Sequence, residues 1–564
     1  MEDQKLESLL NLALDATQEE REKSPNLEIG YEREEKTWEL IVRYSGSLQD
    51  VYALGIRGEE LLGGYAILWV PESLIAGVSR FPQIEYIEKP KRLFFAVSQA
   101  KAASCLTRMQ GEMGLGGRGI LVAVLDSGID YFHQDFRNED GSTRILALWD
   151  QSLGEIYEKE AIDQALQEPT RREALKRVPS VDTSGHGTAV AGIAAGNGRE
   201  SGGLYRGVAY ESPLLVVKLG TAEAEGFPRT TQLMRALDFV VRRAAELSMP
   251  VAVNISFGNT YGSHDGTSLL ETFIDAAAGF GRNVIVAGTG NEGSAGGHAS
   301  GTLTSGQREE ILLSVAPYET SLSVQLWKSF ADRFQISLIA PSGEQLGPFQ
   351  ETLGTHRYVY QDTWVLVYYG EPSPYSQAQE IYVDFIPKDN YLNSGIWRIL
   401  LEPVKLVTGQ YDLWLPSQGV LNPSTRFLSA VPETTLTIPS TASKVISVGA
   451  YDPAYSSYAD FSGRGYTRLS QVKPDLAAPG TNITTTSSQG GYASVTGTSF
   501  AAPFVTGTAA LLMEWGIIQK NDPYLYGEKV KARLKRGARQ LPGFANWPNQ
   551  ELGYGVLCGA DSIL

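Results

Sequence analysis

A continuous apolar run, Ile120–Leu125, ends at Asp126 and constrains the fold more than any other feature. An uninterrupted apolar strand must be buried on both faces, as in a parallel sheet that helices cover on each side. An amphipathic helical pattern spans residues 231–247, and strands that alternate with helices predict a doubly wound parallel α/β sheet. Asp126 is then expected at the carboxyl edge of the sheet, where open α/β folds place their chemistry. Similar apolar runs follow at residues 214–219, 251–256 and 284–287.

A second constraint is the stretch Gly497–Pro503, which reads Gly-Thr-Ser-Phe-Ala-Ala-Pro and opens an apolar segment that continues to Trp515. We expect a buried helix here, with Pro503 tolerated only because it falls in the first turn. Ser499 then lies at the helix N-terminus, where unpaired N–H groups and the helix dipole favour negative charge. Such a serine is suited to acyl transfer if a base and an orienting group lie nearby. Gly185–Ala195 also reads as a helix, beginning near His186.

The pattern changes between residues 300 and 435, where helical periodicity gives way to about eight short alternating strands separated by Pro- and Gly-bearing turns. The α/β pattern resumes at Thr437. We therefore predict an all-β sandwich or jelly roll inserted into one α/β domain. The predicted parts are a small α+β module with an N-terminal extension at 1–99, the first part of the α/β domain at 100–300, the insert at 301–435, and the second part at 436–564.

The N-terminal module is predicted from strand, strand, helix, strand signals between Trp38 and Glu88. Residues 1–35 are charged, and we expect them to be an extension that adds nothing to a core. Residues 93–103 are first apolar and then small and basic, which suits extended binding in a groove.

Composition limits the classes of function that this chain can have. The chain has 564 residues, enough for roughly two to four domains. A net charge of −16 with no basic run argues against nucleic acid or an anionic membrane as the main partner. Cys105 and Cys558 are too few for a disulfide framework, and we expect both to be packing thiols, which fits a reducing compartment.

The N-terminus carries acids where a signal peptide carries bases, and no run of about 18 apolar residues predicts a membrane span. We therefore expect synthesis in the cytoplasm, after which the protein acts there or is carried elsewhere by assembly.

Three motifs together resemble the signatures of the subtilisin-like serine peptidases, in that family's order Asp, His, Ser. They are Asp126-Ser-Gly-Ile-Asp130, His186-Gly-Thr188 and Gly497–Pro503, and Asn291 in a Gly-Thr-Gly-Asn-Glu-Gly context adds a fourth match. The resemblance covers about residues 105–300 and 436–560. Phe500 stands where many relatives have Met, an apolar exchange that should leave the chemistry intact.

The resemblance implies a role for each matched residue. Ser499 would be the nucleophile, His186 the general base, and Asp126 the group that orients and stabilises the imidazolium. The Asn291 amide and the Ser499 backbone N–H would form the oxyanion hole. Substrate strands in this family pair with two edges of the enzyme, which match Ser256, Phe257, Gly258 and Leu219, Gly220 here. Ala287, Gly288 and Thr289 would line the specificity pocket.

The insert and the lack of a signal peptide resemble one branch, the clostridial germination proteases or Csp group. That resemblance implies a propeptide that the enzyme clips from itself and retains in the active-site groove, and a jelly roll that stiffens the catalytic domain. Active members cut the propeptide from a spore cortex-lytic zymogen, which implies packaging in the spore. We predict self-cleavage between Phe95 and Lys101, after Gln99 and before Ala100.

Other readings stay open at this level. The Csp group includes pseudoproteases that signal by binding, and a general degradative peptidase of the cytoplasm would carry the same triad. We expect no metal or other cofactor, because Asp135 matches one calcium-ligand position of the family but Asn197–Gly203 lacks the usual ligands. Asp130 and Asp135 are expected to be structural. The four remaining histidines match no metal-ligand spacing and are expected on the surface or in loops: His133, His264, His298 and His356.

Overall fold

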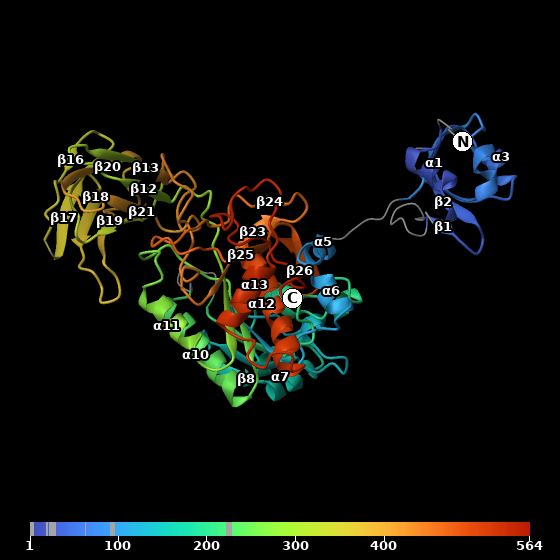
Figure 1. The fold of residues 1–564 in the computed structure, drawn as a ribbon, viewed down its shortest axis with the longest axis horizontal. Coiled ribbons are helices and arrows are strands. Elements are labelled where there is room, and N and C mark those ends of the chain that lie inside the picture. The colour runs from blue at the N-terminus through green and yellow to red at the C-terminus, as the bar shows by residue number, and fades with distance from the viewer. Residues whose placement is uncertain are drawn as a thin grey trace. The chain divides into compact units, whose positions relative to one another are not determined.

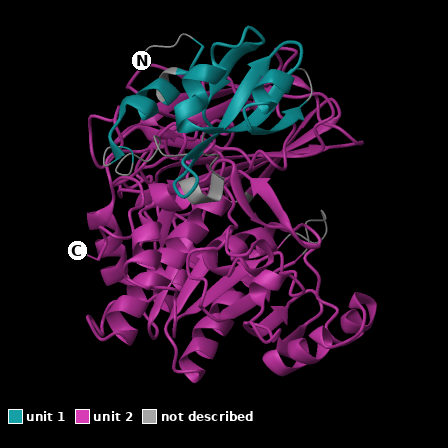
Figure 2. Cartoon of the chain, turned by 90° about the vertical axis from the view of Figure 1, so that its right-hand side faces the viewer, with its two compact units in different colours: residues 1–95 teal, residues 96–564 magenta. Residues whose placement is uncertain are grey.

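The structure, a computed structural model, describes residues 5–18, 21, 30–61, 64–90, 96–220, 228–352 and 354–563. The chain forms two compact units, residues 1–95 and residues 96–564, which Figure 2 shows in separate colours. The boundary falls slightly before the predicted one at 99/100, because the helix that follows it, α5 (Ala96–Ala103), packs within the second unit.

The first unit is the predicted α+β module. Its antiparallel sheet has the order β1-β2-β4-β3, and β5 also pairs with β2. The prediction that residues 1–35 add nothing to the core is wrong, because Leu6, Leu10 and Ala13 are buried with the sheet. Leu10 and Ala13, three residues apart, lie on one side of α1, and Leu6 precedes the helix in a bridge with Ile87. The elements are α1 (Ser8–Asp15), β1 (Tyr31–Glu32), β2 (Thr37–Tyr44), α3 (Gln49–Tyr52), β3 (Arg57–Leu61), β4 (Tyr65–Pro71), η1 (Glu72–Leu74), α4 (Ile75–Val78) and β5 (Ile84–Glu88).

The second unit is built on a nine-stranded sheet, with the order β24-β23-β11-β10-β6-β9-β7-β8 and β25 paired to β23. The pairs from β7 through β23 to β25 are parallel, and the short β8 and β24 are antiparallel. The strands are β6 (Leu121–Asp126), β7 (Ile145–Asp150), β8 (Glu155–Glu158), β9 (Leu214–Lys218), β10 (Val251–Ile255), β11 (Asn283–Gly288), β23 (Ile446–Asp452), β24 (Ser457–Tyr458) and β25 (Leu476–Pro479).

Both faces of this sheet are covered by helices, as the apolar strands require. In β6, Val122 and Val124 join one core with α9 (His186–Ala195) and α12 (Thr498–Met513). Leu121, Ala123 and Leu125 join the other core with α10 (Thr230–Glu246) and α11 (Leu269–Ala277). Figure 1 shows α10 and α11 side by side, apart from α12. The strand order reverses at β6, so Asp126 lies at a switch point of the sheet.

The remaining elements of this unit frame the sheet and its carboxyl edge. Sequence analysis missed β7, β8, α7 and α8, which fill the interval between Asp126 and His186. The elements are α6 (Leu106–Gly111), η2 (Gln134–Phe136), α7 (Lys159–Leu166), α8 (Arg171–Arg177), η3 (Arg199–Ser201), the hairpin β26 (Ile483–Thr486) and β27 (Tyr492–Val495), η4 (Glu514–Ile518) and α13 (Glu528–Gly537).

The insert is a two-layer antiparallel β-sandwich, at the upper left of Figure 1. One sheet has the order β12-β21-β14-β19-β18-β17, the other β16-β15-β20-β13-β22, and side chains from both share one core. All eight predicted strands are present, and three short strands were not predicted: β12, which begins just before the predicted start at 301, β16 and β22. The strands are β12 (His298–Thr302), β13 (Glu309–Val315), β14 (Leu322–Ser329), β15 (Arg333–Ile339), β16 (Gln345–Leu346), β17 (Gly354–Tyr360), β18 (Thr363–Tyr369), β19 (Ala378–Pro387), β20 (Gly395–Lys405), β21 (Gln410–Trp414) and β22 (Arg426–Phe427).

The sandwich is tied to the α/β domain by a ring stack. The Trp414 ring lies parallel to His264 at 4.2 Å and to His298 at 4.8 Å between centroids. Both imidazoles are buried, and so is His133. His133 and His264 nevertheless lie in loops, as expected. The expectation of a surface or loop position is wrong for His298, which is buried in β12. Burial lowers the pKa of His264 to about 4, which keeps this ring neutral in the stack.

One helix among the described residues, Thr498–Ile518, is long and apolar enough to cross a membrane by length and composition. Within the fold, 83% of its apolar window is buried. It packs against the parallel strands β10, β11 and β23 as the central helix of the second unit.

Cys105 and Cys558 are joined by a disulfide, so the prediction that both are packing thiols is wrong. The two residues are 453 positions apart in the sequence, and their Cα atoms lie 4.9 Å apart. Composition could not predict this pairing, because the two cysteines become neighbours only when the fold places the start of α6 beside the C-terminal segment. The bond therefore closes almost the whole second unit into one covalent loop.

Candidate active site

The three motif residues all lie at ends of secondary structure beside the carboxyl edge of the parallel sheet. Asp126 is the last residue of β6, His186 is the first residue of α9, and Ser499 is the second residue of α12. Gly185 precedes α9 with a φ of +75°, and Gly497 precedes α12 with a φ of +150°. Glycine suits these sharp entries because side chains disfavour positive φ. The loop-to-helix junctions thus present His186 and Ser499 at helix N-termini.

Asp126 and His186 form a close pair. His186 Nδ1 lies 2.7 Å from Asp126 Oδ1, which also accepts a hydrogen bond from the Ser127 backbone N–H at 2.8 Å. Asp126 is fully buried, whereas His186 is partly exposed. A carboxylate at Nδ1 fixes the tautomer with its proton on Nδ1, which leaves Nε2 free to accept a proton.

The environment of His186 pushes its pKa in opposing directions. Burial pulls the pKa of His186 down, but the charge of Asp126, the hydrogen bond to Asp126 and the charge of Asp182 outweigh burial. The pKa of His186 is therefore raised above its ordinary value. An imidazole that gains a proton readily is suited to act as a base.

Ser499 is held by the segment that follows β10. Its Oγ donates a hydrogen bond to the Ser256 backbone oxygen at 3.3 Å, and Ser256 Oγ donates to the Ser499 backbone oxygen at 3.0 Å. Asn254 Nδ2 donates to Ser256 Oγ at 2.8 Å, and Asn254 Oδ1 accepts from Thr506 Oγ1 at 3.0 Å. A polar chain thus runs from inside α12 back to its first turn and fixes the serine backbone.

Two aromatic rings place the imidazole beside the serine. The His186 ring lies 5.2 Å from the Phe500 ring and 6.0 Å from the Phe257 ring, measured between centroids. These residues directly follow Ser499 and Ser256 in the chain. The structure therefore brings the three motif segments together, although the Ser499 hydroxyl donates to Ser256 and not to the imidazole. Such bonds are often long or misaligned without substrate.

Asn291 lies beside the N-terminus of α12. Its Oδ1 accepts hydrogen bonds from the Thr498 backbone N–H at 3.1 Å and from Thr498 Oγ1 at 3.2 Å. Since the amide oxygen faces these donors, Nδ2 is the atom left to donate elsewhere. A Cβ built on Gly497 would lie 3.5 Å from Asn291 Nδ2, which places the amide next to the serine loop.

The predicted substrate segments lie at the carboxyl ends of three strands of the parallel sheet, the neighbours β11 and β10 and, on the other side of β6, β9. Leu219 and Gly220 follow β9, Ser256 to Gly258 follow β10, and Ala287 to Thr289 end β11. Backbone packing there is tight: a Cβ on Gly288 would lie 3.1 Å from the Thr498 oxygen. Leu219 and Thr289 are buried, whereas the other segment residues include partly exposed ones such as Phe257. The segments after β10 and at the end of β11 therefore contact the serine loop, whereas Leu219 contacts Asp126 through its backbone N–H.

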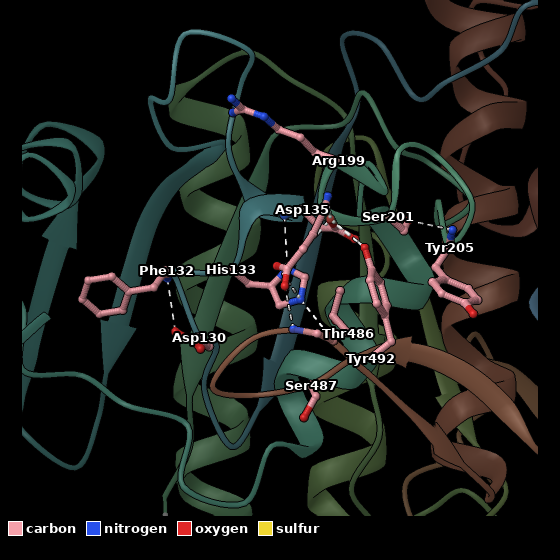
Figure 3. A network of polar contacts seen from close by, with 12 residues as sticks. Asp130, Phe132, His133, Asp135, Arg199, Ser201, Tyr205, Thr486, Ser487 and Tyr492 are labelled. Atoms are coloured by element: carbon pink, nitrogen blue, oxygen red, sulfur yellow. Dashed lines mark hydrogen bonds and ion pairs between the residues drawn. The ribbon is translucent and has the colours of Figure 1, made fainter.

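The calcium-ligand position at Asp135 is occupied by hydrogen bonds from the protein itself (Figure 3). The Asp135 carboxylate accepts from the Tyr492 hydroxyl at 2.9 and 3.0 Å and from the Glu200 backbone N–H at 2.9 Å. Buried His133 accepts from the Asp135 N–H at Nδ1 and lies 2.9 Å from the Gly491 oxygen at Nε2. This network holds the β26–β27 hairpin against η2, a structural role.

Asp130 is likewise structural, since it pairs with Arg171 at 3.1 Å and accepts from the Gln489 N–H at 2.8 Å. Among the residues that the structure describes, three potential metal ligands cluster at Cys105, Cys558 and Asp561, and two of these are the sulfurs of the disulfide.

The predicted cleavage bond between Gln99 and Ala100 lies inside helix α5. The expectation of an extended segment is wrong for residues 96–103, because this small, alanine-rich stretch packs as a helix against β26. Lys101 anchors it, with Nζ donating to the Arg206 oxygen at 2.7 Å. Burial and the nearby Arg206 charge lower the pKa of Lys101 to about 8.

Three polar residues of the site were missed from the sequence: Asp182, Asn254 and Thr506. Each of these residues contacts a site residue or its neighbour and does not itself belong to a recognisable sequence motif. A short signal does exist for Asp182, an acid four residues before the histidine, where it can cap the first turn of the helix.

Residues 117–382 and 422–555 match the Subtilase family, and residues 4–91 match the Csp protease B prodomain. The chain belongs to the subtilase family. This subtilase has a CspB-type prodomain ahead of a subtilisin-like serine endopeptidase domain. The resemblance predicted from the motifs is confirmed.

The solved structure of the Clostridium perfringens CspB protease is similar to this subtilase, with 37% identity and a TM-score of 0.78 over 82% of this chain and 96% of that one. The minor extracellular protease Vpr of Bacillus subtilis (strain 168) is 24% identical over 450 residues, which cover 76% of this chain and 49% of Vpr. A C5a peptidase of Streptococcus pyogenes serotype M18 (strain MGAS8232) is 23% identical over 441 residues, 72% of this chain and 36% of that protein. The chain spans about half or less of these curated relatives.

Proposed function

We propose that this protein is a serine endopeptidase in which Asp126, His186 and Ser499 form the catalytic triad. The observation that carries the proposal is the 2.7 Å contact between His186 and the buried Asp126, formed beside the helix N-terminus that bears Ser499. A rotation about the Ser499 side chain exchanges its bond to the Ser256 oxygen for one to His186 Nε2.

In the proposed reaction, His186 takes the proton from Ser499 as the oxygen attacks the scissile carbonyl. The imidazolium is stabilised by Asp126 and then gives its proton to the leaving amine, so that an acyl-enzyme forms and water later hydrolyses it. The Asn291 amide and the Ser499 N–H would hold the negative oxygen of the intermediate.

The proposed substrate is an extended peptide. The segments after β9 and β10 supply two edges for backbone pairing, and the end of β11, next to β10 in the sheet, lines the pocket. Backbone pairing recognises peptides in general, so the pocket side chains would select the sequence.

The first substrate is proposed to be the chain itself, cut between Gln99 and Ala100, with the propeptide retained in the groove. Because this bond lies within α5, cleavage requires the first turns of that helix to unwind. Intact mass measurement tests the step: the wild type should yield two species that sum to the full chain plus one water, and Ser499→Ala should remain uncut. A wild type that stays full length would overturn self-processing.

The physiological role is proposed to be limited proteolysis of a spore cortex-lytic zymogen during germination, after packaging of the protein in the spore. Support comes from the CspB-type prodomain and from the similarity to the CspB protease structure. The test is to incubate the purified protein, and its Ser499→Ala variant, with a candidate zymogen. One defined cut by the wild type alone supports the role, whereas cutting at many sites favours a general degradative peptidase. No cutting of any substrate, together with no reaction at Ser499, favours a non-catalytic regulator.

A further inference from the structure

Asp182 lies at a junction of hydrogen bonds beside the triad. It is buried, and it precedes α9 by a few residues. Its carboxylate accepts five hydrogen bonds, all from neutral donors. Oδ1 accepts from Ser127 Oγ at 2.8 Å, the Gly185 N–H at 2.9 Å and Ser184 Oγ at 3.3 Å; Oδ2 accepts from the Thr188 N–H at 2.8 Å and Thr188 Oγ1 at 2.6 Å.

These bonds connect the two triad residues that come first in the chain. Ser127 follows Asp126 directly, and its N–H donates to Asp126 Oδ1. Ser127 Oγ accepts from the Gly187 N–H at 2.9 Å while it donates to Asp182. Asp182 thus binds the end of β6 through Ser127 and the first turn of α9 through Gly185 and Thr188. A shift of either element would break several of these bonds at once.

The charges near His186 make Asp182 a second anionic neighbour. Asp126 contacts the ring directly, and Asp182 lies just before the helix that bears it. Lys218 is a cation on this side of the site, and it donates to the Val181 oxygen at 2.9 Å and lies 3.5 Å from Asp150. The faces that Phe257 and Phe500 present to the imidazole are uncharged.

We propose that Asp182 is a positioning residue of this active site, which fixes His186 against Asp126 and adds a second negative charge that stabilises the imidazolium. The proposal rests on the proposed function, because it concerns the same histidine. The raised pKa of His186, to which the charge of Asp182 contributes after Asp126, agrees with it.

A small alkyl fluorophosphonate tests this without a known substrate. Ser499 Oγ forms a bond to phosphorus, the P–F bond breaks, fluoride leaves with the electron pair, and His186 accepts the serine proton. The labelling rate therefore depends on the fraction of neutral His186 and on its placement. The rate is measured across pH for the full-length wild type, for Asp182→Asn and for a matched control, Glu271→Gln.

Glu271 matches Asp182 as a buried acid that caps a helix, because it accepts from the Ser268 N–H and hydroxyl at the start of α11. It has no part in the triad, so Glu271→Gln should label like the wild type. Asp182→Asn removes the charge, so the acid limb of its rate profile should move to lower pH. Its plateau rate should fall by about tenfold to a hundredfold, because His186 is no longer held in place against Asp126. An Asp182→Asn limb at the same pH as in Glu271→Gln would overturn the proposal.

Ser127→Ala gives an independent arm if Asp182→Asn does not fold. It removes the bridge but keeps the Asp182 charge, so the plateau rate should fall about tenfold without the downward shift of the acid limb. A Ser127→Ala rate equal to that of the wild type would overturn the bridging role. Failure of the proposed function gives a different result, since the wild type itself would then not label at Ser499.

Discussion

At the scale of single residues, the site depends on how two side chains are oriented. His186 can act as a base only if its proton sits on Nδ1, and the buried Asp126 carboxylate at 2.7 Å enforces that tautomer. Asn291 can donate to an oxyanion only if its amide oxygen faces away, and Thr498 holds that oxygen with two hydrogen bonds. Asp126 and Thr498 both belong to sequence motifs, but only the fold brings them against His186 and Asn291.

The raised pKa of His186 predicts the pH dependence of the wild type. Only the neutral imidazole accepts the serine proton, and a raised pKa keeps the ring protonated to higher pH. The fluorophosphonate labelling rate should therefore fall on the acid side with a midpoint above about 6.5, the ordinary value for histidine. A midpoint at or below that value would contradict the role of the two acidic neighbours.

Asn291→Ala should slow the enzyme by about a hundredfold to a thousandfold, because one donor to the developing oxyanion is lost. The measurement is the rate of self-processing or of zymogen cleavage. Asn138→Ala is a suitable control, since Asn138 also hydrogen-bonds through its side chain but to Ser142 and the Thr143 oxygen. Equal rates for both variants would exclude Asn291 from the oxyanion hole.

At the scale of elements, α9 must approach β6 very closely for the pair to form. A Cβ on Gly187 would lie 2.2 Å from the Gly128 oxygen and 3.1 Å from Asp126 Cβ. The backbone oxygen cannot move aside as a flexible side chain could. Glycine at the second position of α9 is therefore required for His186 to reach Asp126.

Gly187→Ala should lower the labelling rate at Ser499 by about a hundredfold, because a shift of the helix of even 1 Å misplaces the base. Gly111→Ala is the matched control, since Gly111 is also helical and a Cβ there meets nothing within 4 Å. If Gly187→Ala labelled as fast as Gly111→Ala, the close approach would have no functional consequence.

Elements formed by continuous apolar segments could be predicted from the sequence. Ile120–Leu125, Gly185–Ala195 and the segment after Gly497 became β6, α9 and α12 with small changes at their ends. Helix α5 could not, because a short alanine-rich stretch is helical only where it has a surface to pack on. The triad residues could be predicted because each lies in a short motif with glycines close to it in the sequence. Asp182 could not, because its hydrogen-bond partners come together only in the folded protein.

At the scale of the whole molecule, the disulfide joins two cysteines that the sequence analysis expected to be separate thiols. Cys105 follows the proposed cleavage bond and Cys558 lies near the C-terminus, so the bond encloses the parallel sheet and the sandwich in one loop. The insert is anchored independently, through Trp414 between His264 and His298. The stability of the second unit thus has a covalent part and a packing part.

Reduction of this disulfide should lower the unfolding temperature of the protein. Opening a loop that long costs roughly 2–4 kcal/mol of stability, because the unfolded chain regains conformational freedom. Calorimetry with and without a reductant measures the change. A Cys105→Ser, Cys558→Ser variant should start at the reduced value and show no further effect of reductant; a wild type insensitive to reductant would contradict the bond.

The central claim is that His186 activates Ser499 as a nucleophile. The most direct measurement is fluorophosphonate labelling with the modified peptide identified by mass spectrometry, in the wild type and in His186→Ala. The account predicts that the wild type is modified at Ser499 and that His186→Ala reacts slower by about a thousandfold or more. Equal labelling of the two proteins, or modification at a residue other than Ser499, would contradict it.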